Sequence, residues 1–436
     1  MQKRLAGMNG FFLIWIGQVV SMLASGMSGF ALSIWIFQQT RSATAMGLMQ
    51  FSFTLPFLLV TPIAGVMVDR YNRKVMMAVS DMTAVSATLA ILILQYLGLL
   101  QYWHLYVANI LYGLGNAFQW PAYSAAISMM VKKDDYGRAN GLMSLMEAGP
   151  GVFAPLLAGM LLPLIHLQGI LLLDVLTFFV ALGALLVVFI PQPERTAEGR
   201  AGEGNLLKEA VYGFRYIFQR PSLLGLQMIF FFSNLFFGIG MTVLLPLILL
   251  RTGDDSGALG TVQSAAAIGA VVGGIVMSVW GGFKRRVNGV LAGWFVTGVF
   301  AIFLGLGNGL IFWLVFSMMQ GLVGPLINTS NQAIWQAKVA PDVQGRVFSS
   351  RRLIAWFTQP IAPLIAGILA DRWLEPAMIR GSGWLPALFG GWVGVSAGSG
   401  MALLYIFAGG MVALVGLSGY FIPAVRQAES ILPDHS

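Results

Sequence analysis

The sequence predicts an all-α membrane protein in which twelve transmembrane helices form two pseudo-symmetric bundles of six. Of the 436 residues, 57% are hydrophobic and only 10% are charged, whereas soluble proteins have about 25% charged residues. The chain contains many apolar runs of the roughly 20 residues that are needed to cross a hydrocarbon core. Short motifs also recur in the same order in the two halves of the chain, which favours two related bundles.

Twelve apolar segments account for the predicted transmembrane helices. The first follows Lys3 and Arg4 and continues to about Phe37, which is too long for a signal-peptide core of about 7–15 residues. We therefore expect this segment to be retained as the first helix. The predicted helices cover residues 9–37, 44–68, 75–99, 103–131, 138–166, 169–190, 222–250, 257–282, 287–307, 310–337, 344–371 and 400–423.

The positions of Lys and Arg predict the orientation of the chain in the membrane. If the chain crosses twelve times, all but four of its 25 Lys and Arg residues fall on the side that holds both termini. Loops rich in Lys and Arg stay in the cytoplasm, so we expect both termini to be cytoplasmic. The exceptions are Arg41, Arg251, Arg372 and Arg380. The residues behind the net charge of +8 are scattered between apolar runs, and we expect no nucleic-acid partner.

The composition excludes several kinds of chemistry. The chain has no cysteine, which removes disulfides, thiolate metal sites and cysteine nucleophiles. None of the three histidines, His104, His166 and His435, has the spacing of a metal ligand. The glycine-rich loop with a lysine that binds nucleotide phosphates is missing as well. We therefore expect no catalytic residues, no metal, no cofactor and no enzymatic activity.

A polar stretch between the sixth and seventh predicted helices divides the chain. It is rich in Pro, Glu, Gly and Arg, and it ends in a short amphipathic pattern from Leu206 to Phe218, which predicts a surface helix. We expect an N-terminal six-helix bundle at 1–190, a cytoplasmic linker with this helix at 191–221, and a C-terminal bundle with a cytoplasmic tail at 222–436.

Two pairs of motifs relate the halves to each other. Asp134–Arg138 (DDYGR) corresponds to Asp342–Arg346 (DVQGR), and Ala154–Gly159 (APLLAG) corresponds to Ala362–Gly367 (APLIAG). In both pairs the second motif begins the same number of residues after the first. Two repeated halves that face each other across a central site are the architecture that supports alternating access.

The charged corner at Gly65–Lys74 (GVMVDRYNRK) lies between the second and third predicted helices. Its glycine, acidic–basic pair and two further basic residues resemble the loop after the second helix in the major facilitator superfamily. Nearly the whole chain resembles this superfamily, and in particular the macrolide-efflux-like branch of its drug:proton antiporters. The residues that carry the second resemblance are Leu173–Phe178, Gly367–Arg372, Glu375-Pro376 and Leu432–Asp434.

The resemblance implies the major facilitator fold and a secondary active transporter in the bacterial cytoplasmic (inner) membrane. Such a protein would export hydrophobic or amphiphilic small molecules, including drug- or macrolide-like compounds, by proton-coupled alternating access. Its partners would be a small lipophilic substrate, protons and membrane lipids, and we expect a monomer. Three other functions stay open at this point: a transporter of lysophospholipids or other lipids, a transporter of siderophores or metabolites, and a membrane sensor that does not transport.

Glu147 is the first candidate for proton coupling. It lies about ten residues into the fifth predicted helix, hence about 15 Å deep at about 1.5 Å per residue. An ionised carboxylate is unfavourable at that depth, so desolvation favours uptake of a proton, which is released where the group faces water. Asp81 in the third predicted helix is the second candidate. A structural hydrogen bond is the alternative role for both residues, and for Asp174 we expect the structural role.

Five charged residues near the predicted cytoplasmic surface are candidates for a gate. A few partly buried ion pairs can bias a molecule between two packings, and in the resembled family the aspartate of the loop engages the opposite half when the cytoplasmic side is closed. The alternative is that these charges only set the orientation in the membrane. The candidates are Asp69, Arg70, Arg73, Arg138 and Arg346.

Arg351 and Arg352 lie about two turns inside the eleventh predicted helix. Because a charge inside a transmembrane segment is unfavourable, we expect at least one of them to face an acidic partner or a water-filled path. The other is expected to extend its side chain to the membrane interface.

The superfamily pattern also implies a substrate cavity lined by the first, fourth, seventh and tenth helices. Polar and aromatic side chains with few charges suit large lipophilic molecules, including cations, for which Glu147 would be the counter-charge. Packing between helices is the alternative role of such residues. The cavity candidates are Gln18, Asn116, Gln119, Trp120, Tyr123, Asn234, Asn328, Asn331 and Trp335.

Overall fold

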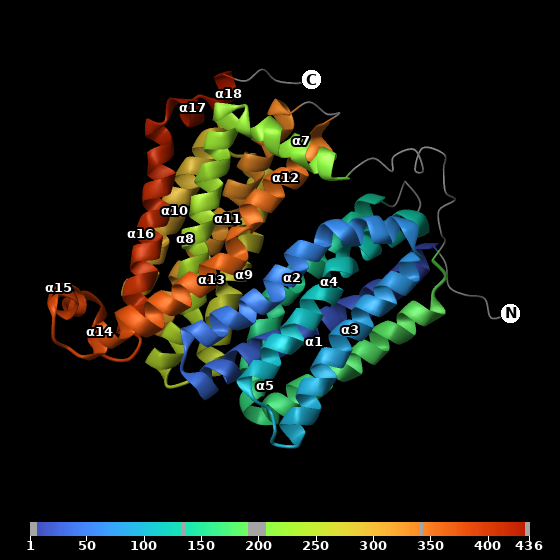
Figure 1. Ribbon diagram of the computed structural model, residues 1–436, viewed down its shortest axis with the longest axis horizontal. Helices are drawn as coiled ribbons and strands as arrows, with labels where there is room; N and C mark the ends of the chain where they lie inside the picture. Colours follow the sequence, from blue (N-terminus) through green and yellow to red (C-terminus); the bar gives the residue numbers. More distant parts are fainter. Residues whose placement is uncertain (1–6, 132–135, 191–205, 340–342, 432–436) are drawn as a thin grey trace. The chain divides into compact units, whose positions relative to one another are not determined.

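A computed structural model describes residues 7–131, 136–190, 206–339 and 343–431 of the chain. These residues fold into helices that are connected by short turns (Figure 1). Within this part of the chain, ten helical segments are long and apolar enough to cross a membrane. The architecture is that of an all-α multi-pass membrane protein, as the sequence predicts.

The helices of the N-terminal half begin and end close to their predicted bounds. They are α1 (Gly7–Thr40), α2 (Ala43–Arg70), α3 (Arg73–Tyr96), α4 (Tyr102–Met130) and α5 (Tyr136–Val187). The fifth and the sixth predicted helix both lie within α5, which His166 interrupts with a φ of 56° and a ψ of −179°. This break falls at the residue where the fifth predicted helix ends.

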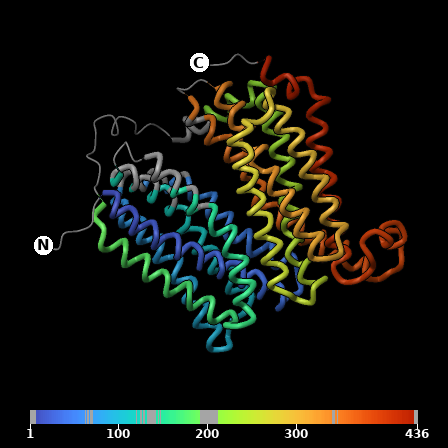
Figure 2. The backbone as a smooth tube through the Cα atoms, turned by 180° about the vertical axis from the view of Figure 1, so that it is seen from behind, coloured from blue at the N-terminus to red at the C-terminus, as the bar shows by residue number. Residues whose placement is uncertain are grey.

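The C-terminal half contains more helices than the sequence predicts. They are α7 (Leu206–Phe218), α8 (Pro221–Thr252), α9 (Ser256–Trp280), α10 (Arg286–Leu306), α11 (Leu310–Lys338), α12 (Gln344–Trp356), α13 (Thr358–Leu369), η3 (Ala370–Leu374), α14 (Glu375–Ile379), α15 (Trp384–Val393), α16 (Ser399–Phe421), α17 (Pro423–Arg426) and α18 (Ala428–Ile431). The eleventh predicted helix corresponds to α12, α13 and η3, which follow one another directly. The helix α14 continues directly from η3, and α15 lies in the loop that follows it and projects from unit 2 before α16 (Figures 1 and 2).

Side-chain caps define the corners at which two helices of the N-terminal half begin. Ser42 Oγ accepts a hydrogen bond from Ala45 N (3.1 Å) at the start of α2. Asn72 Oδ1 accepts hydrogen bonds from Lys74 N (3.0 Å) and Val75 N (3.3 Å) at the start of α3. Such caps satisfy backbone donors that the first turn of a helix leaves unpaired. The charged corner is therefore a tight turn between the end of α2 and the start of α3.

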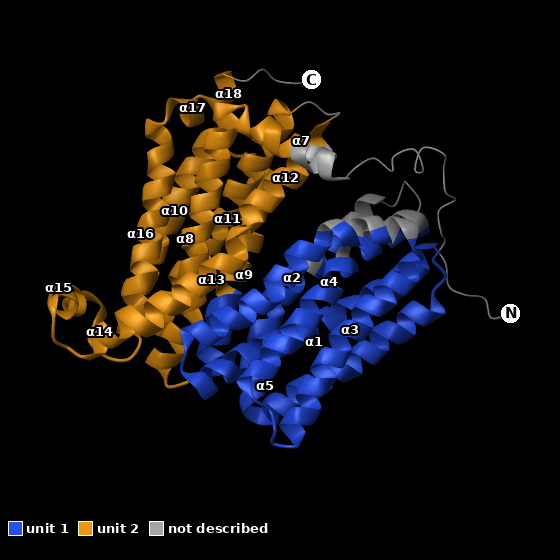
Figure 3. Ribbon diagram, viewed as in Figure 1, with its two compact units in different colours: residues 1–194, 255–264 blue, residues 195–254, 265–436 orange. Residues whose placement is uncertain are grey.

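The chain divides into two compact units (Figure 3). Unit 1 comprises residues 1–194 and 255–264, and unit 2 comprises residues 195–254 and 265–436. The boundary therefore falls within α9. The connection between the halves includes α7, which covers the residues for which the sequence predicts a short amphipathic helix.

The first turns of α9 pack on α5 within unit 1. Ser256 Oγ donates a hydrogen bond to the carbonyl oxygen of Gly159 (3.1 Å). One turn further along α9, a Cβ atom at Gly260 would lie 2.3 Å from the carbonyl oxygen of Pro155. Because a side chain at this position would collide with the backbone of α5, glycine permits the close contact of the two helices.

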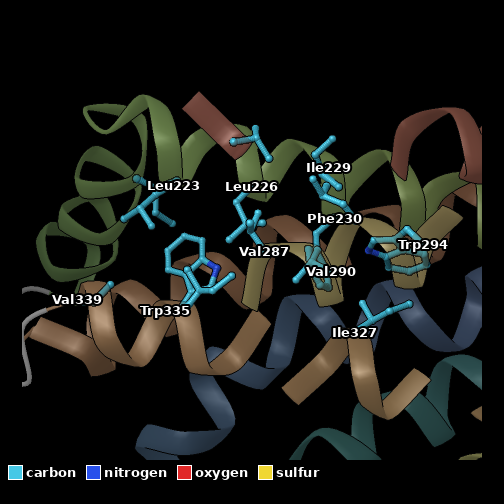
Figure 4. Close-up of a cluster of buried hydrophobic side chains, with 14 of the residues drawn as sticks. Leu223, Leu226, Ile229, Phe230, Val287, Val290, Trp294, Ile327, Trp335 and Val339 are labelled. Atoms are coloured by element: carbon cyan, nitrogen blue, oxygen red, sulfur yellow. The ribbon is translucent and has the colours of Figure 1, made fainter. Parts of the chain in front are cut away.

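A core of unit 2 lies between α8, α10 and α11 (Figure 4). Phe230 of α8 and Trp294 of α10 meet edge to face, with 5.6 Å between their ring centroids. Trp335 of α11 is fully buried beside Leu223 and Leu226 of α8. Aromatic pairs of this geometry add to the stability that apolar burial supplies.

The end of the described chain returns to this core. Glu429 of α18 accepts hydrogen bonds from the backbone N–H groups of Arg286 (3.1 Å, to Oε1) and Val287 (3.0 Å, to Oε2) at the start of α10. Lys338 Nζ, at the end of α11, donates a hydrogen bond to the carbonyl oxygen of Glu429. A carboxylate at a helix N-terminus also interacts favourably with the helix dipole. The last helix thus caps α10 and is fastened to α11.

Candidate functional site

A polar cluster in unit 1 brings together three residues from three helices. Gln119 Nε2 of α4 donates hydrogen bonds to Asp81 Oδ1 of α3 (2.8 Å) and to Gln18 Oε1 of α1 (3.0 Å). Gln18 Nε2 donates in turn to Asp81 Oδ2 (3.2 Å), and Gln18 is only 3% exposed. The second proton-coupling candidate therefore lies against two of the cavity candidates.

Close packing of α3 on α4 places this cluster. Ser80 Oγ donates a hydrogen bond to the carbonyl oxygen of Gly115 (2.8 Å). A Cβ atom at Gly115 would lie 2.9 Å from Thr83 Cβ, so a larger residue would push the two helices apart. Asp81 follows Ser80, and Gln119 lies one turn beyond Gly115, so the same contact sets Asp81 opposite Gln119.

One polar atom of the cluster is left without a partner. Gln119 Oε1 is buried and accepts no hydrogen bond from the residues that the structure describes. Both N–H groups of an amide are donors and its oxygen is an acceptor, and Gln119 Nε2 already donates to Gln18 and Asp81. A half-turn of this amide would turn Oε1 toward Asp81, where a protonated carboxyl group could donate to it.

Asp174 is held in a different way. This residue of α5 is 5% exposed, and two hydroxyl groups donate to its carboxylate: Ser25 Oγ of α1 to Oδ1 (2.7 Å) and Thr88 Oγ1 of α3 to Oδ2 (3.2 Å). The hydroxyl groups tie three helices together. This arrangement supports the structural role that the sequence suggests, although side chains rather than a helix cap satisfy the carboxylate.

Glu147 lies in the first half of α5, but its side chain is outside the described residues. The same holds for the side chains of Trp120 and of four gate candidates, which are Asp69, Arg70, Arg138 and Arg346. The fifth gate candidate, Arg73, is the first residue of α3 and is half-buried.

The two remaining cavity candidates of unit 1 do not contact Asp81. Tyr123 is buried in an apolar cluster with Met143 and Met146, and its hydroxyl group has no partner among the described residues. Asn116 is half-buried on α4. Of the candidates in this half whose side chains are described, only Gln18 and Gln119 share a hydrogen-bonded cluster with Asp81.

Residues of unit 2 line an open cavity of about 570 Å³, which lies in the usual size range of small-molecule sites, roughly 300–1,000 Å³. Three of the cavity candidates line it: Asn234 of α8 and Asn328 and Asn331 of α11. The glutamines that line the cavity beside these asparagines were not predicted from the sequence. The seven amide side chains on the wall are Gln227, Asn234, Gln320, Asn328, Asn331, Gln332 and Gln359.

Trp335 does not line this cavity. It is completely buried, and its Nε1 donates a hydrogen bond to Asn331 Oδ1 (3.0 Å). Trp335 thus holds the amide of Asn331, whereas other aromatic residues supply the apolar wall. These are Phe230, Phe237, Trp294, Phe348 and Trp356.

Two arginines of α12 also line the cavity. Arg351 donates from Nη1 to Gln332 Oε1 (2.9 Å), and its guanidinium lies 5.1 Å from the ring centre of Trp335. Arg352 lies over Trp356, 4.0 Å from its ring centre. The sequence suggests an acidic partner or a water-filled path for at least one of these arginines, and both side chains line the cavity. The two guanidinium groups make the cavity wall positively charged, whereas a counter-charge for cationic substrates would be negative.

No group of three or more His, Asp or Glu side chains in the described part of the chain could hold a metal ion. The lining of the cavity in unit 2, as far as the structure describes it, consists of amide, hydroxyl, aromatic, aliphatic and guanidinium groups. Groups of these kinds are able to recognise a molecule by shape, hydrogen bonds and positive charge.

The sequence was compared with protein families and with characterised proteins. The sequence model of the Major Facilitator Superfamily matches residues 14–349. The chain is 25% identical to macrolide efflux protein A of Streptococcus pyogenes over 83% of its own length and 89% of that protein. It is also 25% identical to the multidrug efflux pump Tap of Mycolicibacterium fortuitum, over 82% of its own length and 88% of that protein.

The fold was compared with solved structures. An inward-facing bacterial homologue of the human lysosomal transporter Spinster has a TM-score of 0.66 and 16% sequence identity, and the match covers 94% of this chain and 97% of that one. This likeness concerns the fold, whereas the family match rests on the sequence. Taken with the helical membrane architecture, the match over most of the sequence shows that the chain belongs to the Major Facilitator Superfamily of membrane transporters.

Proposed function

We propose that the protein exports hydrophobic or amphiphilic small molecules, such as macrolide-like drugs, in exchange for protons. The observation that carries this proposal is the cluster of Asp81 with Gln18 and Gln119. A carboxyl group inside a membrane helix is costly and is usually functional. Similarity to two efflux proteins supports export as the direction.

Asp81 has the partners that a proton carrier needs. In the described part of the chain its side-chain hydrogen bonds come from two neutral amides, so no fixed cation holds it in the ionised form. The amide donors suit the carboxylate, and the free Gln119 Oε1 suits the protonated carboxyl group. Because both partners are uncharged amides, the cluster holds Asp81 without fixing its charge.

Glu147 stays in the proposal beside Asp81 because of its depth in α5. We place both termini in the cytoplasm on the basis of the charge distribution. On that side Asp69, Arg70, Arg73, Arg138 and Arg346 would form the gate. The two six-helix bundles, joined by the linker with α7, would then alternate about the substrate as a monomer in the lipid bilayer.

Transport in liposomes tests the coupling. Purified protein is reconstituted, a pH gradient is imposed, and the uptake of erythromycin is followed with and without the gradient. We expect the gradient to accelerate uptake at least about tenfold, which corresponds to roughly 1.4 kcal/mol. Asp81→Asn or Glu147→Gln, whichever changes the proton carrier, should abolish this acceleration.

Asp174→Asn is the matched control, because it neutralises a third carboxyl group of the same unit that is held by hydroxyl groups. It should keep the response to the gradient. Gradient-dependent uptake that survives in both Asp81→Asn and Glu147→Gln would show that neither residue carries the proton. Uptake that ignores the gradient in the unmodified protein would exclude proton coupling itself.

A further inference from the structure

We propose that the cavity of unit 2 binds the acidic group of an amphiphilic substrate, a carboxylate or a phosphate, through Arg351. This inference rests on the proposed transport function and specifies the chemistry of one class of substrate. Such a substrate would place its acid at Arg351 and its apolar body against the aromatic wall of the cavity.

The first argument is the charge of Arg351. Its interactions within the described residues are with neutral groups: Gln332 Oε1 at 2.9 Å and the rings of Trp335 and Phe348, 5.1 and 5.8 Å from the guanidinium carbon. Neutral partners orient a guanidinium without neutralising it. Removing a charge from water is costly unless an opposite charge compensates for it, so an anion in the cavity would be stabilised there.

The second argument is the geometry of the group. A guanidinium presents five N–H donors in a planar fork that matches the two oxygens of a carboxylate or phosphate. Gln332 accepts a hydrogen bond from one of the terminal nitrogens of Arg351, and among the described residues the guanidinium makes no other hydrogen bond. The remaining donors are therefore available to a ligand at the cavity wall.

The third argument comes from two polar groups on the opposite helix. Trp294 Nε1 and Thr297 Oγ1 of α10 belong to residues that line the cavity. Both atoms are buried and have no hydrogen-bond partner among the described residues. A buried polar group without a partner is unfavourable, and a change of side-chain rotamer that turned either group into the cavity would let an acceptor oxygen of the ligand satisfy it.

The fourth argument is the character of the wall between these groups. Its aromatic residues Phe230, Phe237 and Trp356 would cover an apolar body, and the amides around them would bind polar substituents. Among the lining residues that the structure describes, none is an aspartate or a glutamate. The cavity therefore favours acids over amines of the same shape.

Binding of matched probes tests this inference without any gradient. The purified full chain in dodecyl maltoside is titrated at pH 7.5 with 4-(1-pyrenyl)butanoic acid and with its neutral primary amide. Energy transfer from tryptophan to pyrene reports binding. We expect the acid to bind at least tenfold more tightly than the amide, and Arg351→Gln to remove this preference while leaving the affinity for the amide unchanged.

Two further variants control for charge and folding. Arg351→Lys keeps the charge but not the fork, so the preference for the acid should be intermediate. Arg285→Gln removes one positive charge at an exposed position whose side chain does not cap α10, and it should bind both probes as the unmodified protein does. Equal affinity of the unmodified protein for acid and amide would overturn the inference, as would a preference that persists in Arg351→Gln. The first comparison needs no variant, so a variant that does not fold leaves the test decisive.

The acid could belong to a soluble amphiphile or to a lipid headgroup. Analysis of lipids that copurify with the protein distinguishes these sources. Phosphatidylglycerol retained by the unmodified protein but not by Arg351→Gln would indicate a lipid, whereas equal lipid retention with intact probe preference would indicate a soluble acid. If the protein takes up erythromycin in response to the proton gradient but shows no preference for the acid probe, only this inference is refuted. The reverse result would refute only the proposed function.

Discussion

Two carboxyl groups of unit 1, the half-buried Asp81 and the buried Asp174, differ in the groups that hold them. Asp81 receives hydrogen bonds from two long amide side chains, whereas Asp174 receives them from the short hydroxyl groups of Ser25 and Thr88. A hydroxyl on a short side chain has little freedom to move away, while an amide on a longer side chain can rotate. This difference favours Asp81 over Asp174 as a candidate for proton exchange, and we propose that Asp174 joins helices.

Ser25→Ala tests the structural assignment at the level of one residue. It removes the donor 2.7 Å from Asp174 Oδ1 and leaves a buried carboxylate with fewer partners, so we expect a loss of stability of about 1–3 kcal/mol. Thermal unfolding of the protein in detergent measures this loss, and gradient-driven uptake per folded molecule should not change.

Ser33→Ala on the same helix is the control. Ser33 Oγ donates only to the carbonyl oxygen of Gly29, one turn earlier in α1, and removing this bond should change the stability by no more than about 0.5 kcal/mol. Equal melting temperatures for Ser25→Ala and Ser33→Ala would contradict the structural role of Asp174.

At the level of the helix, glycines determine how closely α9 and α11 approach within unit 2. A Cβ atom at Gly273 of α9 would lie 2.2 Å from the carbonyl oxygen of Leu322 in α11, whereas a Cβ at the next residue, Gly274, would meet nothing within 4 Å. The two positions are neighbours on one helix and differ only in what they face. They therefore form a matched pair.

Gly273→Ala should destabilise the protein by about 1–3 kcal/mol, because the added methyl group forces the helix backbones apart. Gly274→Ala should be neutral or should stabilise it by up to about 1 kcal/mol, since alanine favours a helix more than glycine does. Melting temperatures of the two variants, measured side by side, test both expectations. If both variants melt alike, the close approach of the helices does not depend on Gly273.

At the scale of the whole molecule, the orientation predicted from the basic residues can be measured directly, because the chain has no cysteine. Ser382 lies between α14 and α15, and Lys284 lies between α9 and α10; both are exposed. In intact cells a membrane-impermeant maleimide should label Ser382→Cys and should label Lys284→Cys only after lysis. The opposite pattern would place the termini outside the cell.

The helices were largely predictable from the sequence because hydropathy belongs to a run of residues and needs no knowledge of neighbours. The break at His166 was predictable because one apolar run ends there. The family was predictable because short sequence motifs carry the resemblance. The short helix α15 was not predicted, because its ten residues are fewer than a membrane crossing needs.

The site was predicted only in part, because the direction in which a side chain points depends on the packing of its helix. Trp335 and Asn331 lie one turn apart on α11, yet Asn331 lines the cavity while Trp335 is buried behind it. Arg351 was noticed for its charge, but two of the neutral groups around it, Gln332 and Trp335, come from another helix, α11. The pairing of Asp81 with Gln119 likewise depends on how α3 packs on α4.

The short helix near the C-terminus matters for anyone who modifies that end of the protein. Shortening the chain to Phe421 would delete Glu429 and leave the amide groups of Arg286 and Val287 to be hydrated. An epitope or fluorescent fusion should therefore be joined beyond Ile431, where it leaves this carboxylate seated on α10.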